Sequence, residues 1–515
     1  MQRSVIGTLV RRLAPILLVL ALLAPLAVPS ASATEPRHSP AHPSLQRLAD
    51  QDPNQLVRVI VQSRNSDSEL EAKVEHKGGK GKKALHLIKG VAAEISAGKA
   101  QELADDPDVK WVTLDAPMLS TAGPQPIEIS GLATDYPASV RATELWTSPA
   151  RITGAGVTVA VIDSGFKHDL RDFEAISTGR KRVLEEVRLN SEARSNNDKY
   201  GHGTAVAGII AGSGRGYSRG EYIGIAPDAN LINVKVSDEQ GMAYLSDVVE
   251  GLEWVVRNRD LYNIRVVNLS LVSGVPESYL TSPLDAAVEM AWLSGIAVVV
   301  SAGNLGADSM LYPPANDPFA ITVGAVDTNG TSDISDDQMP AWSSYGQTAE
   351  GFSKPEVVAP GRRIVSLLSQ RGCILARVFP ERVVDNDFIR LSGTSMAAPV
   401  VSGIAALALQ AHPGWTPDQV KSALVATARP ISQPGSGAGE VDAVAVVSLA
   451  DPDYANRGLP MSIGISALTG TTSYDSATWN SATWNSATWN SATWNSATWN
   501  SATWNSATWN SAYPD

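Results

Sequence analysis

The sequence predicts an α/β protein with a doubly wound parallel sheet and helices on both faces. Apolar runs of strand length lie at 157–162, 231–236, 266–271, 297–301 and 321–325, and segments with helical spacing alternate with them. The first of these runs is continuous rather than alternating, which is typical of a strand that is buried on both faces of a parallel sheet. The alternation of strand and helix favours the same arrangement.

The chain is long, acidic and contains a single cysteine. Its 515 residues are more than one hydrophobic core usually takes, so two or three regions are expected. A net charge of −12 argues against a nucleic-acid partner. Cys373 has no second cysteine with which to pair, so an intramolecular disulfide is excluded. We interpret Cys373 as a small apolar side chain, because no histidine motif accompanies it in the sequence.

Residues 1–33 have the pattern of a signal peptide. Arg3, Arg11 and Arg12 precede an apolar stretch at 13–28 that prolines interrupt, and an Ala-Ser-Ala cleavage site follows. We therefore expect a secreted protein that meets a membrane only during export. A membrane anchor is the alternative, and the arginine pair leaves a twin-arginine signal open.

Residues 55–118 are predicted to form a small α+β module. The segments 57–62, 90–96 and 109–115 have the pattern of strands, and 99–105 has that of a short helix.

The segments around these regions are rich in lysine, proline or small polar residues. Residues 73–89 carry lysines spaced by glycines, and we interpret them as a solvated loop, with an anion site as the alternative. Residues 34–54, 119–139 and 451–475 are expected to be linkers. Prolines and a glycine mark the second of these as extended, exposed chain.

Ser395 is the strongest candidate for a nucleophile. It stands in the run GTSMAAP at 393–399, where small residues let a substrate backbone approach. The apolar segment 400–409 that follows has the pattern of a closely packed helix. A serine at a helix N-terminus lies where N–H groups point outward and negative charge is favoured, which suits the formation of an oxyanion. A simple helix N-cap is the alternative.

A serine nucleophile needs a general base and a group that orients this base. His202 stands in GHGTAVAG at 201–208, where the two flanking glycines predict an exposed imidazole at a turn before a helix. Asp163 ends the first apolar strand, so its carboxylate is expected at the carboxyl edge of the sheet, where sites form in open α/β folds. An aspartate that only starts a turn is the alternative.

Asn304 is the candidate donor for the oxyanion. It follows the strand 297–301, so its side-chain amide is expected at the same edge of the sheet, beside the backbone N–H of Ser395. An asparagine in a left-handed turn is the alternative.

In their order along the chain, Asp163, His202, Asn304 and Ser395 resemble the motifs of the subtilases, the subtilisin-like serine peptidases. The resemblance covers about residues 140–450 and rests most specifically on GTSMAAP, GHGTAVAG and VIDSG. It implies an Asp-His-Ser triad, an oxyanion-hole amide, and hydrolysis of protein or peptide substrates through an acyl-enzyme. No cofactor is expected.

The resemblance also implies two further features. The module 55–118 resembles the ferredoxin-like propeptide of this family, which assists folding and inhibits the enzyme until the enzyme cleaves it off. Substrate is expected to contact two segments near the triad, namely Ser270, Leu271, Val272 and Ser273, and Ala302 with Gly303. Subtilases usually have two glycines where this chain has Val272 and Ser273, so these side chains should narrow the substrate cleft.

Subtilases often bind structural calcium. The loop 213–220 offers arginines rather than a series of oxygen ligands, so we predict no metal in it.

The tail consists of the pentapeptide SATWN, repeated without variation over residues 476–510. A period of five matches neither helix nor strand, and the repeat contains no charge and no large aliphatic residue. Three interpretations stay open, namely a disordered tail, a repeat that binds a cell surface or glycan through its tryptophans, and a short self-associating solenoid.

Two alternatives to a secreted serine endopeptidase also stay open. One is a catalytically silent protein of the same fold that attaches to a surface through its tail. The other is an esterase that uses the same triad.

Overall fold

The computed structural model describes residues 41, 43–63, 70–85, 90–114, 132–176, 178–216 and 220–475. The chain divides into two compact units, Met1–Thr121 and Ala122–Asp515. The expected signal peptide, most of the expected processing linker and the SATWN repeat lie outside the described residues, as do residues 217–219 of the loop considered for calcium.

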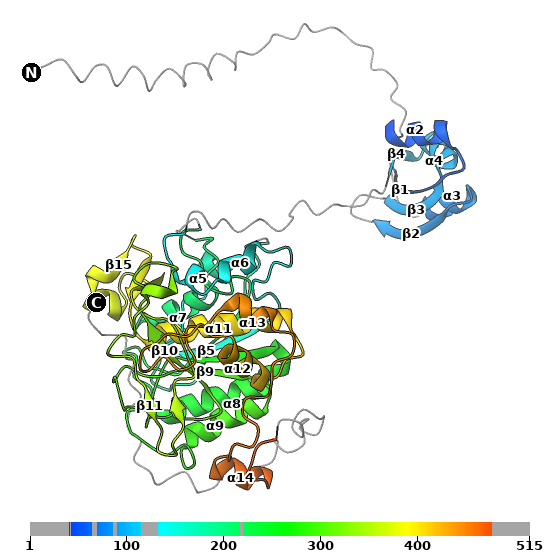
Figure 1. The fold of residues 1–515 in the computed structure, drawn as a ribbon. Helices are drawn as coiled ribbons and strands as arrows, with labels where there is room; N and C mark the ends of the chain where they lie inside the picture. Colours follow the sequence, from blue (N-terminus) through cyan, green and yellow to red (C-terminus); the bar gives the residue numbers. More distant parts are fainter. Residues whose placement is uncertain are drawn as a thin grey trace, which may run out of the picture. The chain divides into compact units, whose positions relative to one another are not determined.

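A seven-stranded sheet forms the centre of the larger unit (Figure 1). Its order is β13-β10-β9-β8-β5-β7-β6, and all pairs are parallel. The strands are β5 (Thr158–Asp163), β6 (Val183–Arg188), β7 (Asn230–Lys235), β8 (Ile264–Leu269), β9 (Ala297–Ser301), β10 (Ile321–Val326) and β13 (Val357–Pro360). The doubly wound fold that we predicted is confirmed. The chain leaves β5 in one direction and returns on its other side at β8, so the carboxyl ends of these two strands flank the switch point where α/β folds place their sites.

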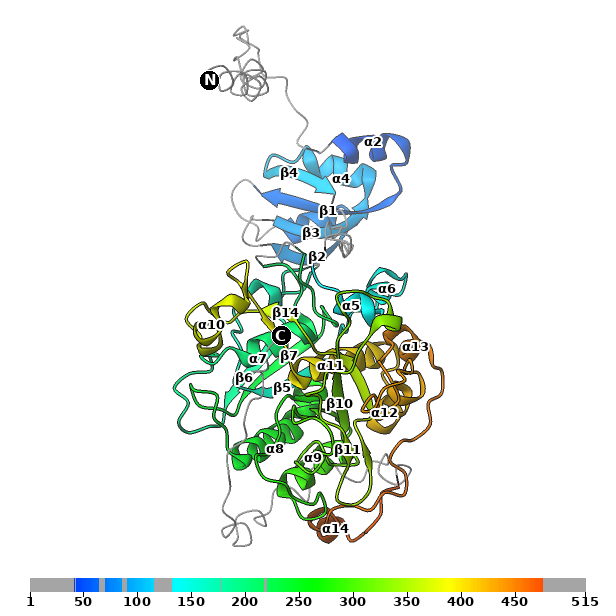
Figure 2. The ribbon, with the colours of Figure 1, turned by 60° about the vertical axis from the view of Figure 1, so that its left-hand side comes forward.

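Helices cover both faces of this sheet (Figures 1 and 2). One face carries α7 (His202–Ala211) and α11 (Thr394–Ala411), which contact each other. The other carries α8 (Leu245–Tyr262) and α9 (Pro283–Leu293). Among the described residues, α11 is the one helix long and apolar enough to cross a membrane, but 89% of it is buried inside the protein, as expected of a core helix.

Shorter elements surround this body. They are α5 (Tyr136–Ser139), α6 (Ala142–Thr147), η2 (Arg171–Phe173), η3 (Ile334–Asp336), β11 (Gly346–Gln347), β12 (Ser353–Lys354), β14 (Ile364–Leu367), α10 (Ile374–Val378), η4 (Pro380–Arg382), β15 (Val383–Val384), β16 (Phe388–Leu391), α12 (Pro417–Ala426), α13 (Ala443–Ser448) and α14 (Ile463–Thr469). The hydroxyl of Thr416 accepts a hydrogen bond from the backbone of Gln419 and so caps α12.

The strand β6 was not predicted from the sequence. Its segment, Val-Leu-Glu-Glu-Val-Arg, mixes charges with aliphatic residues, and its side chains are mostly half-buried. Its position explains this pattern, because β6 is the last strand of the sheet, and charged side chains at an edge prevent pairing with other chains.

The smaller unit is an antiparallel sheet packed with helices. Its sheet has the order β2-β3-β1-β4. The elements are α2 (Pro43–Gln51), β1 (Leu56–Ser63), α3 (Leu70–His76), β2 (Lys80–Leu85), β3 (Gly90–Ser96), α4 (Ala97–Ala104) and β4 (Val109–Leu114). Aliphatic side chains such as Val59, Val61 and Leu103 form a core of its own.

Two expectations for this unit need correction. The lysine-rich segment 73–89 is not simply a loop, because it contains the end of α3 and the strand β2. Lysines suit β2 because it lies at the edge of the sheet. The segment expected to be a linker, 34–54, contains α2, whose Leu45 is fully buried in the core.

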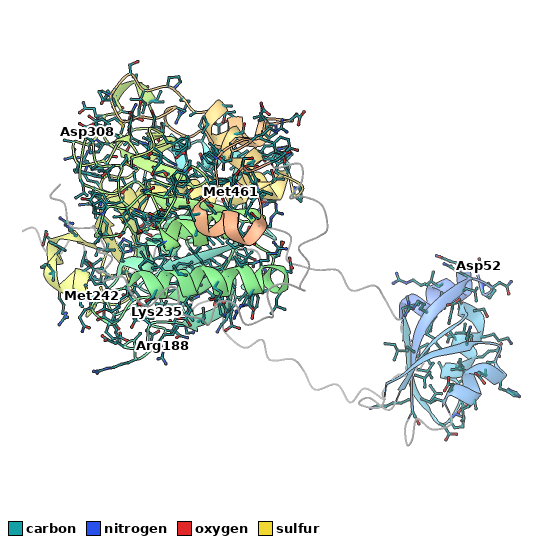
Figure 3. The ribbon with its side chains drawn as sticks, turned by 90° about the horizontal axis from the view of Figure 1, so that it is seen from below. Asp52, Arg188, Lys235, Met242, Asp308 and Met461 are labelled. Carbon is teal, nitrogen blue, oxygen red and sulfur yellow. The ribbon has the colours of Figure 1, made fainter. Side chains whose placement is uncertain are left out.

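Residues 451–475, expected to link two regions, instead pack on the larger unit. Met461, labelled in Figure 3, is only 3% exposed. Glu289 of α9 accepts hydrogen bonds from the backbone and hydroxyl of Ser462, at 3.0 and 2.8 Å. The hydroxyl of Tyr474 donates to Asp418 at 2.7 Å. These contacts join residues 451–475 to the helices α9 and α12.

Candidate active site

Asp163 and His202 meet at the carboxyl edge of the sheet. Asp163 is the last residue of β5, and His202 is the first of α7. The imidazole Nδ1 lies 2.9 and 3.0 Å from the two carboxylate oxygens of Asp163. A carboxylate that accepts from Nδ1 fixes the hydrogen there and leaves Nε2 with the basic lone pair. The pair has the orientation that a general base requires.

The glycines around His202 are required by close contacts. A Cβ at Gly203 would lie 2.1 Å from the carbonyl oxygen of Gly165 and 2.9 Å from Asp163 Oδ1. Gly201 has a φ of 106°, which favours glycine. A Cβ at Gly201 would also lie 2.7 Å from the sulfur of Cys373. Only glycine at these positions therefore lets α7 begin so close to the end of β5.

The imidazole is buried, whereas the sequence predicted an exposed one. His202 has no exposed surface. The segment at the start of α10 contacts the loop that precedes His202. The backbone N–H groups of Ile374 and Leu375 donate to the carbonyl oxygens of Lys199 and Tyr200 at 3.0 Å each. This segment lies about 170 residues further along the chain, so the local pattern around the histidine could not indicate it.

A second buried carboxylate, Asp198, joins the two segments that carry the pair. Its Oδ1 accepts from the hydroxyl of Ser164 at 2.9 Å and the N–H of Gly201 at 2.6 Å. Its Oδ2 accepts from the N–H and hydroxyl of Thr204 at 2.9 and 2.8 Å. Burial raises the pKa of Asp198, and the hydrogen bonds from Gly201 and Thr204 act in the opposite direction.

Ser395 lies in the first turn of α11 and is 3% exposed. Its hydroxyl donates to the backbone oxygen of Ser270 at 3.1 Å, and the hydroxyl of Ser270 donates to the backbone oxygen of Ser395 at 3.0 Å. Asn268 links this contact to the middle of α11, since its Nδ2 donates to Ser270 Oγ and its Oδ1 accepts from Ser402, both at 2.9 Å. The start of α11 is therefore fixed to the end of β8.

Asn304 lies next to the same helix terminus. Its Oδ1 accepts from the backbone N–H and the hydroxyl of Thr394, at 2.9 and 3.0 Å. The Thr394 hydroxyl also accepts from the N–H of Gly303 at 3.1 Å. Because the oxygen of the amide is held by donors, its Nδ2 is the end that can donate to an anion beside Ser395.

The residues predicted to contact substrate lie around this point. Val272 is 6% exposed and packs in a small apolar cluster with Ala302, Met310 and Ala315. Ser273 donates its backbone N–H to the carbonyl oxygen of Pro313 at 2.7 Å. Gly303 has φ of 98°, and an added Cβ would lie 3.2 Å from Ser344 Oγ. The remaining two, Ser270 and Leu271, follow β8 directly.

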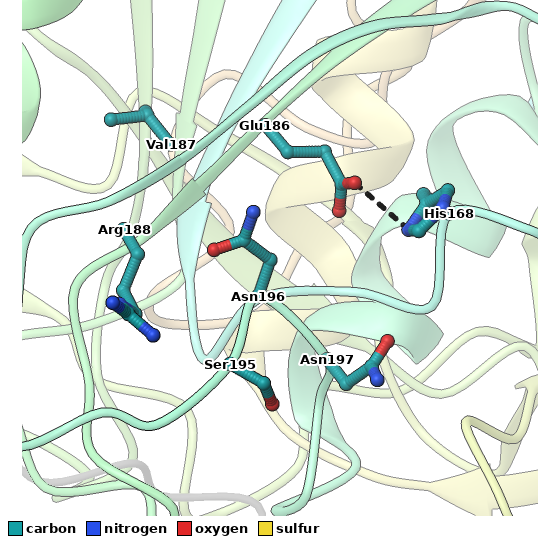
Figure 4. A pocket seen from close by; sticks show the side chains of 7 residues that line it. All are labelled: His168, Glu186, Val187, Arg188, Ser195, Asn196 and Asn197. Carbon is teal, nitrogen blue, oxygen red and sulfur yellow. Dashed lines mark ion pairs between the residues drawn. The ribbon is translucent and has the colours of Figure 1, made fainter.

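An open hollow of about 610 Å³ lies beside the segment that precedes Asp198 (Figure 4). His168 Nδ1 and Glu186 Oε2 form an ion pair in its lining at 2.9 Å. Its lining is polar and consists of His168, Glu186, Val187, Arg188, Ser195, Asn196 and Asn197. None of the predicted site residues lines it. Within the described part of the chain, no group of three or more His, Cys, Asp or Glu side chains is placed to hold a metal ion.

Sequence reasoning missed Asp198, Ser164 and Thr394. Thr394 and Ser164 stand next to Ser395 and Asp163 inside the recognised motifs, so their positions were a usable signal. Asp198 ends a polar run with Ser195, and such a run is typical of any loop.

Comparison with known proteins gives the family of this chain. The model of the subtilase family matches residues 154–489. The serine protease AprX of Bacillus subtilis (strain 168) is 40% identical over 305 residues, which are 58% of this chain and 66% of that protein. Subtilisin NAT of Bacillus subtilis subsp. natto is 33% identical over 358 residues, 69% of this chain and 79% of the relative.

An extracellular serine proteinase of Thermus sp. (strain Rt41A) is also similar, with 34% identity over 343 residues that cover 67% of this chain and 72% of the relative. The family match spans well over half of the chain, and it includes all four predicted motifs. The chain therefore belongs to the subtilase family and is a subtilisin-like serine endopeptidase.

Proposed function

We propose that Asp163, His202 and Ser395 form the catalytic triad of this peptidase. His202 Nε2 takes the proton of Ser395 as its hydroxyl attacks the peptide carbonyl, and later gives it to the leaving amine. Asp163 holds the imidazole in the required tautomer and stabilises its charge. The observation that carries this proposal is the contact of His202 Nδ1 with both oxygens of Asp163. To attack, the Ser395 hydroxyl leaves the carbonyl oxygen of Ser270 and turns toward the imidazole.

The oxyanion is held by Asn304 Nδ2 and the backbone N–H of Ser395. Two properties of the site support this role. The hydrogen bonds from Thr394 orient the amide of Asn304, and the N-terminus of α11 favours negative charge next to Ser395. Substrate is expected along Ser270–Ser273 and Ala302–Gly303.

We further propose that the enzyme is secreted as a precursor and removes its own propeptide. The pattern of residues 1–33 supports export, and one relative is named as extracellular. The separate core of the smaller unit supports its role as a propeptide that assists folding and inhibits the enzyme. Cleavage would fall in the expected processing linker.

Replacement of the nucleophile tests both proposals. Ser395→Ala should remain a full-length precursor and lose peptidase activity by about 10⁶-fold, the loss that removal of the nucleophile causes in subtilisin. Ser191→Ala, at an exposed serine of the same unit, should mature normally. N-terminal sequencing of the secreted protein gives the cleavage site. Maturation of Ser395→Ala at the wild-type rate would refute self-processing.

Labelling with a fluorophosphonate separates the enzyme from a catalytically silent relative of the same fold. We expect Ser395 of the mature protein to be labelled, and labelling to disappear in Ser395→Ala. A folded, mature protein that is not labelled would support the silent binding protein. An esterase would be labelled but would hydrolyse esters without cleaving peptides or its own precursor.

The SATWN tail is proposed to bind a cell-surface or glycan component. The sequence carries seven tryptophans at a spacing of five residues there, and their rings can stack on sugars. A chain that ends at residue 475 should keep its peptidase activity and lose its retention on cell-wall polysaccharide. Equal retention of both forms would leave the tail without this role.

A further inference from the structure

We propose that Asp198 is a positioning residue of the proton relay. Asp198 keeps the imidazole of His202 and the carboxylate of Asp163 in place relative to each other. This inference rests on the proposed triad. Asp198 contacts neither the imidazole nor the nucleophile in any hydrogen bond of the site, and it acts through the segments that carry them.

The hydrogen bonds of Asp198 divide between two parts of the fold. On one side, Ser164 immediately follows Asp163, and its own N–H donates to Asp163 Oδ1 at 2.7 Å. On the other side, Gly201 and Thr204 bracket His202 at the start of α7. One carboxylate therefore ties the end of the strand to the start of the helix.

Ser164 strengthens this link in both directions. Its hydroxyl donates to Asp198 Oδ1 and accepts from the N–H of Gly203 at 2.9 Å. A shift of α7 along the sheet would break the bonds to Gly201, Gly203 and Thr204 together. Such a shift would also move the imidazole away from Asp163, because His202 lies between these residues in the chain.

Burial of the charged carboxylate of Asp198 costs free energy. The side chain is 1% exposed, and isolated buried carboxylates are strongly disfavoured. Four donated hydrogen bonds hold it as an acceptor, which is the ionised form. Simple capping of α7 would need one or two of these bonds, and it would not require the bond to Ser164 on the neighbouring strand.

The test compares Asp198→Asn with wild-type enzyme and with Asp172→Asn. Asp172 is also a buried carboxylate, at 2% exposure, but it lies in η2 and bonds to neither triad segment. An asparagine retains the shape but has one acceptor oxygen for four donors. We expect kcat to fall by about 10²-fold with KM almost unchanged, because a small displacement of the base affects the chemical step. Asp172→Asn should keep the wild-type kcat.

A second variant covers the case that Asp198→Asn does not fold. Ser164→Ala leaves the Asp198 charge and the bonds to Gly201 and Thr204 in place and removes the link to β5. It should lower kcat with KM almost unchanged. Wild-type kcat in either variant would overturn the proposal. So would a loss of thermal stability in Asp198→Asn with unchanged kcat per labelled active site, which is the result of a purely structural role.

The result is also distinguishable from a failure of the proposed triad. Fluorophosphonate labelling reports on Ser395 in each variant. If the wild-type protein is not labelled, the triad itself is wrong. If the wild type is labelled and Asp198→Asn is labelled equally fast, the triad stands and the positioning role of Asp198 falls.

Discussion

At the residue scale, the side-chain amide of Asn304 faces one way because Thr394 holds its oxygen. A hydrogen-bond donor stabilises an oxyanion only if it points at the place where the charge develops. The orientation of Asn304 is therefore as important as its identity. Thr394 supplies this orientation from the turn that also carries Ser395.

Two substitutions separate the donor from the residue that orients it. Asn304→Ala should lower kcat by about 10²–10³-fold with little change in KM, because the lost bond forms mainly in the transition state. Thr394→Val removes the hydroxyl and keeps the backbone donor, so its loss should be smaller. Steady-state kinetics on a peptide substrate measures both. An equal or larger loss in Thr394→Val would mean that the hydroxyl does more than orient the amide.

At the element scale, α11 packs so closely that one of its positions has no room for a methyl group. A Cβ at Gly403 would lie 2.5 Å from Ile225 Cβ and 2.7 Å from its Cγ2. Since α11 contacts five strands of the sheet as well as α7, it cannot move away to relieve a clash. Glycine is unfavourable inside a helix, and here close packing outweighs this cost.

Gly403→Ala should destabilise the protein by about 1–3 kcal/mol through overpacking, against a gain of about 1 kcal/mol in helix propensity. Gly464→Ala in α14 is the matched control, because the nearest atom to its added Cβ is Ala286 Cβ at 3.6 Å. It should be neutral or stabilising. Chemical denaturation in a Ser395→Ala background, which prevents self-digestion, measures both. Equal effects at the two sites would contradict the packing argument.

The packing of residues 451–475 on α9 should depend on pH. Burial, and then the charge of Asp317, raise the pKa of Glu289 from 4.5 to about 9. Between these values the folded state retains a proton that the unfolded state has lost. The contribution of Glu289 to stability is therefore fully present below pH 4.5 and is lost as pH rises toward 9.

Glu289→Gln removes this dependence because an amide has no proton to lose in this range. The melting temperature of Glu289→Gln should then fall less than that of the unsubstituted protein between about pH 5 and pH 8.5. The difference should be about 2–4 °C for each kcal/mol of pH-dependent unfolding free energy that the substitution removes. Some decline should remain, since burial also raises the pKa of Asp317, to about 7. Thermal unfolding of the Ser395→Ala protein is the measurement, with exposed Glu192→Gln as control. An unchanged slope in Glu289→Gln would show that Glu289 ionises normally.

At the scale of the whole molecule, the described part of the chain has two units with separate cores. The larger unit has a parallel sheet built from strands far apart in the sequence, and such sheets form slowly. In the smaller unit, β2 and β3 are consecutive in the sequence and pair with each other. If the smaller unit assists folding, its own stability should control how much enzyme matures, and it should not affect the enzyme that has matured.

Val61→Ala tests this separation. Val61 is fully buried in β1, and its truncation should destabilise the smaller unit by about 2 kcal/mol. We expect a lower yield of mature enzyme with unchanged activity per labelled active site. Leu56→Ala, at a residue of the same strand that is 68% exposed, should give the normal yield. A changed specific activity in mature Val61→Ala enzyme would contradict removal of this unit.

The sequence by itself determined the larger fold and the family. Strand runs such as 157–162 and 297–301 show their burial locally, and parallel strands bring their carboxyl ends to one edge. This was enough to predict that Asp163 and Asn304 lie at the same edge of the sheet. The motifs around His202 and Ser395 then supplied the family.

The tertiary structure alone decided which other side chains hold these groups in place. Asp198 bonds to a side chain 34 positions away, Thr394 bonds to a side chain 90 positions away, and Glu289 holds a segment 173 positions further along the chain. No periodicity or motif encodes such pairs, because each depends on how distant segments pack. Local pattern therefore predicts the elements and the reacting groups, while long-range contacts determine how precisely those groups are held.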